Sequence, residues 1–106
     1  MILFYDHLVD KTEINIYLDK LDAPDNHKGK IRQLVDDILH QGLLEFILQK
    51  LHPHQHTTFL DRFHAAPFDP ELLEYLQDHA SEDIDKELRT EANRLISLIK
   101  KDLHIW

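Results

Sequence analysis

Two apolar stripes that point in different directions lie on one helical stretch between Ile31 and Leu51. The first half carries apolar residues at the i, i+3, i+4, i+7 spacing of an amphipathic helix: Ile31, Leu34, Val35, Ile38 and Leu39. A denser set follows Gly42: Leu43, Leu44, Phe46, Ile47, Leu48 and Leu51. At 3.6 residues per turn, the second set is centred about 150° around the axis from the first. We therefore expect either a break near Gly42 or one long helix that serves two packing partners.

The composition favours helix over sheet throughout the chain. Only two glycines occur in 106 residues, and the apolar residues are mostly Leu and Ile rather than Val and Thr. Residues 1–106 are near the commonest size of one domain, so we expect a single helical domain. No cysteine is present, which excludes disulfides and thiolate chemistry.

The N-terminus and the charge indicate a cytoplasmic protein with a protein partner. Asp6 and Asp10 interrupt the apolar start, which has no basic region before it, so we expect no signal peptide. No apolar run approaches the roughly 20 residues of a membrane span. A net charge of −8 argues against nucleic-acid binding, which needs a basic face. The same charge suits a basic protein partner, as in an acidic inhibitor or DNA mimic.

Prolines and helix caps divide the chain into about five helices. Asp10-Lys11-Thr12-Glu13 has the form of a capping box before the stripe of Ile14, Tyr17, Leu18 and Leu21. Residues 1–9 are compatible with an extended segment or a helical turn. Pro24 and Asp25 suit the start of the long helix, which we expect to run to about Leu51.

Three further helices follow the long one. His52-Pro53 ends it and starts a third helix that turns Phe59, Leu60 and Phe63 inward. Asp69-Pro70-Glu71 has the residues of a helix start and opens the fourth. Ser81 caps the fifth, whose stripe consists of Ile84, Leu88, Ala92, Leu95, Ile96, Ile99 and Leu103. The pattern predicts an all-α protein, an irregular bundle around one long central helix of about residues 25–51.

Gly42 is expected to organise this bundle. Glycine inside a helix costs about 1 kcal/mol relative to alanine, so its presence indicates a kink or a close helix contact. We expect the first stripe to pack on the N-terminal helix and the second to meet Phe59, Phe63, Leu76 and Leu95. The long helix would then join two subclusters of the core.

The middle and the C-terminal part of the chain also follow a family pattern. A long helix ends in Leu-x-x-Leu, a Pro-started helix contains Phe-Leu, an Asp-Pro-Glu-Leu-Leu helix follows, and a charged helix ends the chain. These parts are residues 43–51, 53–63, 69–76 and 84–103, about two-thirds of the chain. The chain resembles in this respect a group of short uncharacterised all-helical proteins from small-genome bacteria. That group has no assigned activity, so the resemblance implies a helical fold and no function.

Histidines supply the candidate metal site. The segment His52-Pro53-His54-Gln55-His56 is rich in imidazole, and His64 lies two turns after His56. Imidazoles bind zinc, nickel or copper when they converge on one ion. On a helix, however, His54 and His56 point about 200° apart. A solvated helix start is the simpler interpretation, and a histidine-based metal or pH sensor remains the alternative function.

No pattern of catalytic residues emerges, and we expect neither an enzyme nor a cofactor. The acid pairs Asp36-Asp37 and Glu82-Asp83 fall on polar helix faces or at a helix start. Ser81 is explained as a helix cap, and no glycine-rich phosphate loop occurs.

The leading hypothesis is a non-enzymatic protein–protein interaction module, with a homodimer as one form of it. Its basis is the wide apolar arc of the long helix and the long stripe of the last one, which offer more apolar surface than short helices cover. The expected interface residues are Leu43, Leu44, Phe46, Ile47, Leu48, Leu98, Ile105 and Trp106.

Overall fold

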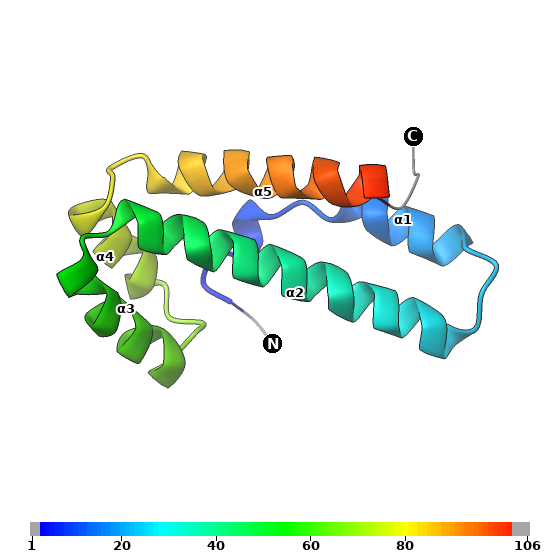
Figure 1. Ribbon diagram of the computed structural model, residues 1–106, viewed down its shortest axis with the longest axis horizontal. Coiled ribbons are helices and arrows are strands. Elements are labelled where there is room, and N and C mark those ends of the chain that lie inside the picture. Colours follow the sequence, from blue (N-terminus) through cyan, green and yellow to red (C-terminus); the bar gives the residue numbers. More distant parts are fainter. Residues whose placement is uncertain (1–2, 103–106) are drawn as a thin grey trace.

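The computed structural model describes residues 3–102, and this part of the chain is an all-α bundle. A short 3₁₀ turn, η1, precedes five α-helices (Figure 1). Their bounds are η1 Asp6–Leu8, α1 Thr12–Lys20, α2 Asp25–Lys50, α3 Pro53–Ala65, α4 Glu71–His79 and α5 Ile84–Asp102. None of the helices within these residues has the length and apolarity that crossing a bilayer requires.

Two long helices form the spine of the molecule. Figure 1 shows α2 and α5 running side by side in opposite directions, and their mutual contact is the most extensive between any two elements. The helix α1 lies at the end of the spine where α2 begins, whereas α3 and α4 lie at the end where α2 stops. The result is an elongated shape of 47 × 26 × 20 Å.

The helix α2 is continuous through Gly42, so the expected alternative of a break is wrong. Its buried residues are Val35, Leu39, Leu43 and Ile47, with Leu51 directly after its end. These positions recur every four residues, and each step of four advances about 40° around an α-helix. The buried face therefore winds gradually around α2 and does not switch at one point.

The two predicted stripes of α2 are only partly buried. In the first stripe Leu34 and Ile38 are exposed, which corrects the expectation that the whole stripe packs inward. Only Val35 and Leu39 are buried, because α1 and α5 cover only that side of the helix. Two exposed ion pairs connect this half of α2 to the α1 region, Lys11–Asp36 at 2.9 Å and Arg32–Asp19 at 2.8 Å. Ile14 and Leu18 of α1 also line a shallow depression with Val35, so α1 lies beside the first half of α2.

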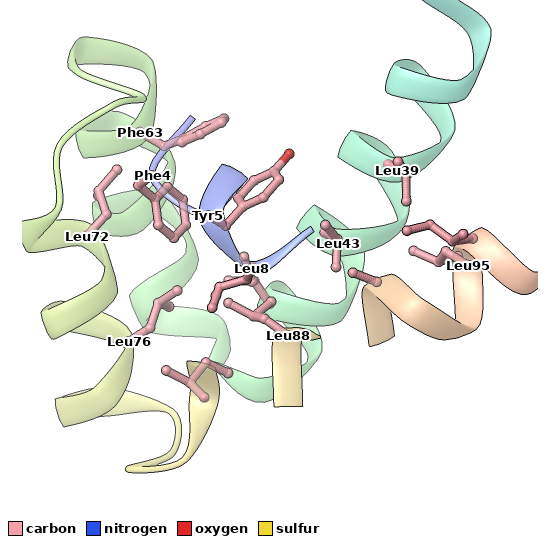
Figure 2. Packing of buried hydrophobic residues seen from close by; sticks show 14 of the residues in the cluster. Phe4, Tyr5, Leu8, Leu39, Leu43, Phe63, Leu72, Leu76, Leu88 and Leu95 are labelled. Carbon is pink, nitrogen blue, oxygen red and sulfur yellow. The ribbon is translucent and has the colours of Figure 1, made fainter. Parts of the chain in front are cut away.

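The N-terminal segment forms a turn at Phe4 and Tyr5 followed by the 3₁₀ turn η1, and its side chains enter the centre of the bundle. Phe4, Tyr5 and Leu8 are buried, and the Phe4 backbone N–H donates to the carbonyl of Pro67 at 2.8 Å. The Phe4 ring stands edge-on to Phe63, 6.0 Å between centroids. Figure 2 shows Phe4, Tyr5 and Leu8 lying among side chains of the surrounding helices.

These contacts merge the core into one cluster, so the prediction of two subclusters is wrong. The cluster runs from Ile14 and Leu18 of α1 to Phe59 of α3 and Leu76 of α4. Phe4 of the N-terminal segment contacts Phe59 and Phe63 within this cluster.

Polar side chains at several helix starts accept from backbone N–H groups, but the predicted capping box at Asp10–Glu13 does not form. Lys11 is the N-cap of α1, and the Glu13 carboxylate binds Lys100 instead. The Asp10 carboxylate accepts from the Thr12 N–H at 3.0 Å and from the Thr12 hydroxyl, and these bonds lower the pKa of Asp10. Pro53 is the first residue of α3. The Asp69 carboxylate accepts from the Glu71 N–H at 3.0 Å. Polar side chains thus satisfy N–H groups that have no partner inside their own helix.

Candidate interaction surface

The most prominent surface feature is a pair of exposed apolar side chains on α2. Leu34 is 59% exposed and Ile38 is 41% exposed, and they lie one turn apart, about 100° around the helix from the buried Val35 and Leu39. Ile31, one turn earlier, is half-buried against the core. Single exposed apolar residues are ordinary, whereas an aligned group is typical of an interaction surface.

The register between α2 and α5 brings a third exposed residue to this group. A Cβ on Gly42 would lie 2.7 Å from Leu95 Cδ1, so the Leu95 side chain sits directly on the Gly42 backbone. Figure 2 shows Leu95 of α5 beside Leu39 and Leu43 of α2. Because the helices are antiparallel, Leu98 lies about 4.5 Å further along α5, level with Ile38. Leu98 is 48% exposed.

The three residues lie on the side of the α2–α5 spine that faces away from the N-terminal segment. On α2, Asp36 and His40 line a depression with that segment, and both lie about 160° around the helix from Ile38. Leu98 lies two helical turns after Glu91 on the same face of α5. Glu91 lines a depression of about 390 Å³ together with Phe46 of α2. The opposite side of α5 faces η1, where Arg89 lines a depression with Leu8. We call Leu34, Ile38 and Leu98 the apolar patch.

The predicted interface residues divide into three groups. Leu43 and Ile47 are fully buried in the core of their own chain, so their assignment to an interface is corrected. Leu44, Phe46 and Leu48 are half-buried and pack against the same core. Leu98 is exposed and belongs to the apolar patch. Ile105 and Trp106 lie outside the described residues.

The error has a simple physical cause. An unpartnered α2 would expose both apolar arcs equally, and neighbouring elements decide which arc is covered. The core cluster covers Leu43 and Ile47 of the dense second arc, whereas Leu34 and Ile38 of the sparser first arc remain exposed.

The four candidate metal ligands are not brought together. Within residues 3–102, no three His, Asp or Glu side chains gather in a way that could hold a metal ion. The His52 and His54 rings stack on one another, 5.4 Å between centroids. His64 is exposed near the other end of α3 and adjoins the ring of Phe63.

His56 instead binds backbone carbonyl groups at the end of α2. Its Nε2 lies 2.6 Å from the carbonyl oxygen of Leu48 and 3.2 Å from that of Leu51. A carbonyl oxygen only accepts, so Nε2 carries a proton and donates to both. The imidazole thereby satisfies carbonyls that the end of a helix leaves unpaired. In this arrangement Nε2 has no lone pair for a metal.

A polar cavity between the N-terminal segment and α2 was not predicted from the sequence. It has a volume of about 280 Å³ and is lined by Leu3, Tyr5, Asp6, Val9, Lys11, Gln33, Asp36, Asp37, Leu39 and His40. The Tyr5 hydroxyl and His40 Nδ1 lie 2.9 Å apart, and the His40 ring stacks on Phe63. Burial raises the pKa of Tyr5, and the negative charges of Asp6 and Asp36 raise it further.

The members of this cavity are far apart in sequence. Tyr5 and His40 are separated by 35 residues, and no spacing rule connects them. The acid pair Asp36-Asp37, considered above for acid–base chemistry, contributes to the cavity wall. Asp36 is bound to Lys11, and Asp37 accepts from the Gln33 amide at 2.8 Å. Both carboxylates therefore already have partners in the chain.

Comparison with known proteins adds no assignment to this surface. No protein-family model, no curated protein and no solved structure gives a significant match to the chain.

Proposed function

We propose that this protein is a non-enzymatic protein–protein interaction module that docks through the apolar patch. The observation that carries the proposal is the alignment of Leu34, Ile38 and Leu98, each more than two-fifths exposed, on one side of the two longest helices. Rigid helices present such side chains with little loss of conformational entropy on binding, which favours their use as anchors.

The surroundings of the patch support docking rather than chemistry. The patch is apolar at its centre and is flanked by exposed polar residues such as Lys30, Gln41 and Glu45. An apolar centre inside a polar rim is the usual anatomy of a protein interface. We place this activity in the cytoplasm, as the sequence suggests, with a protein rather than a nucleic acid or a membrane as partner.

The proposal is tested by affinity capture from the native cell, followed by quantitative mass spectrometry. Leu98→Glu places a charge in the patch at an exposed position, so the fold is retained. Phe68→Glu is the matched control, because Phe68 is 63% exposed but lies in the loop between α3 and α4. A partner that is depleted with Leu98→Glu and retained with Phe68→Glu supports the proposal. Identical captures by all three proteins contradict it.

A further inference from the structure

We propose that the partner of the apolar patch is a second copy of this chain, held by antiparallel pairing of α2 with α2 of the partner. This inference rests on the proposed function and names its partner. The contact would be isologous, with the same strip of α2 used on both copies, as in most homodimers.

The spacing of residues along α2 supports this pairing. The exposed side of α2 carries a strip of six residues within an arc of about 80°. They are His27, Ile31, Leu34, Ile38, Gln41 and Glu45, and all but the half-buried Ile31 are exposed. Their separations alternate between four and three, which is the period of a coiled-coil seam.

The strip is symmetric about Asp36. Leu34 and Ile38 lie two residues on either side of it, Ile31 and Gln41 five residues, and His27 and Glu45 nine residues. An antiparallel pair with its two-fold axis at this point therefore brings Leu34 against the partner's Ile38 and Ile38 against the partner's Leu34. Each of the six positions meets another member of the strip.

Charge also favours the antiparallel arrangement. The ammonium group of Lys30 lies near the start of the strip, whereas the carboxylate of Glu45 lies at its end. Antiparallel pairing places the basic end of each helix against the acidic end of the partner helix. Parallel pairing would place Lys30 against the partner's Lys30 and Glu45 against the partner's Glu45, and like charges disfavour that arrangement.

The antiparallel neighbour α5 completes the contact. Leu98 lies level with Ile38 on the same side of the spine and extends the apolar area beyond α2. Two spines that pack through this side form a four-helix layer of α2, α5 and their counterparts. The strip from His27 to Glu45 is about 27 Å long, so the interface is small and the dimer is of moderate affinity.

The test is sedimentation equilibrium over a range of concentrations. It compares the wild type with two variants that carry opposite charges at the two central positions, Leu34 and Ile38. The wild type is expected to change from 12.6 kDa towards twice that mass as concentration rises. Leu34→Glu and Ile38→Lys each place a charge opposite an apolar side chain of the partner. Each is expected to weaken self-association by about tenfold or more, because burying an unpaired charge costs more than about 1.4 kcal/mol.

An equimolar mixture of the two variants is the decisive sample. In the mixed dimer the introduced carboxylate faces the introduced ammonium, and the other central contact remains Leu against Ile. The mixture is therefore expected to associate more strongly than either variant alone. Ile16→Glu is the matched control, because Ile16 is 47% exposed on α1. It is expected to leave the association unchanged, and circular dichroism checks that every variant is folded.

Each other result overturns the inference. A wild type that stays at 12.6 kDa up to about millimolar concentration has no second-copy partner of useful affinity. A dimer that Ile16→Glu weakens as strongly as the two strip variants uses another surface, and a mixture without recovery excludes the antiparallel register. If the wild type is monomeric while cell capture still depends on Leu98, the inference that the partner is a second copy is wrong, and the proposed docking function through the apolar patch stands.

Discussion

Replacing each of the two glycines of α2 by alanine separates the close helix contact from ordinary helix propensity. Gly29 has no atom within 4 Å of the position of an added Cβ, whereas Gly42 would place that carbon 2.7 Å from Leu95 Cδ1 and 3.1 Å from Cδ2. The two substitutions change the same atoms in the same helix. Their difference in effect therefore reports the contact between α2 and α5.

The magnitudes follow from two opposing contributions. Alanine is favoured over glycine inside a helix by about 1 kcal/mol, and Gly29→Ala near the helix start is expected to gain about 0.5 kcal/mol. Gly42→Ala, in the helix interior, has the full helix gain of about 1 kcal/mol. Against it, Leu95 must retreat by about 1 Å to a normal carbon–carbon distance. Overpacking of this kind costs about 1–3 kcal/mol. Leu95 is 9% exposed and has some room to move, so we expect Gly42→Ala to be neutral or about 1 kcal/mol less stable.

Urea unfolding followed by circular dichroism measures both free energies of unfolding. A double-mutant cycle tests whether Gly42 and Leu95 are energetically coupled. Leu95→Ala should cost about 1 kcal/mol less in the Gly42→Ala background than in the wild type, because the added methyl group fills the space that the leucine leaves. The larger Gly42→Leu is expected to cost about 3 kcal/mol or more and to lower the melting temperature. If Gly42→Ala stabilises as much as Gly29→Ala, and the cycle shows no coupling, the proposed contact between Gly42 and Leu95 is refuted.

Two further predictions concern single side chains. Tyr5→Phe removes the hydrogen bond to His40 and should cost about 1 kcal/mol at neutral pH, measured by urea unfolding. Burial raises the pKa of Tyr5 in the folded state, so above about pH 10 the unfolded chain loses the phenolic proton first and the free energy of unfolding falls as pH rises. Tyr5→Phe should show a shallower fall. Parallel pH profiles of the wild type and Tyr5→Phe would contradict the burial of Tyr5. His56→Ala removes the donor to the last carbonyls of α2 and should cost about 1 kcal/mol in the same assay. His54→Ala, at an exposed neighbour on α3, should be close to neutral, and equal losses would show that His56 has no capping role.

The helix starts and the α5 stripe were predictable because their signals are local. The residues at Asp69-Pro70-Glu71 and His52-Pro53 set backbone geometry within one turn, without help from the rest of the fold. The α5 stripe has the spacing of one face, and its described members from Ile84 to Ile99 are all buried. A single face leaves no choice about which side turns inward.

Two features depend on contacts between distant segments and could not be predicted from the sequence. The helix α2 has apolar residues on more than one side, so periodicity alone could not show that Leu34 and Ile38 face solvent. The covering elements α1 and α5 decide that, and they come from both ends of the chain. Similarly, the contact of Tyr5 with His40 depends on the path of residues 3–9 through the bundle, which the sequence left open between two conformations.

The central claim is that α2 has one apolar face in the core and another free for a partner. Alanine substitutions at neighbouring positions test it directly, through urea unfolding at low micromolar concentration, where self-association is weak. Leu39→Ala is expected to cost about 2–4 kcal/mol, because Leu39 is 3% exposed. Leu34→Ala is expected to stay within about 0.5 kcal/mol of the wild type. Equal losses at the two positions would contradict the claim, because they would place Leu34 in the core.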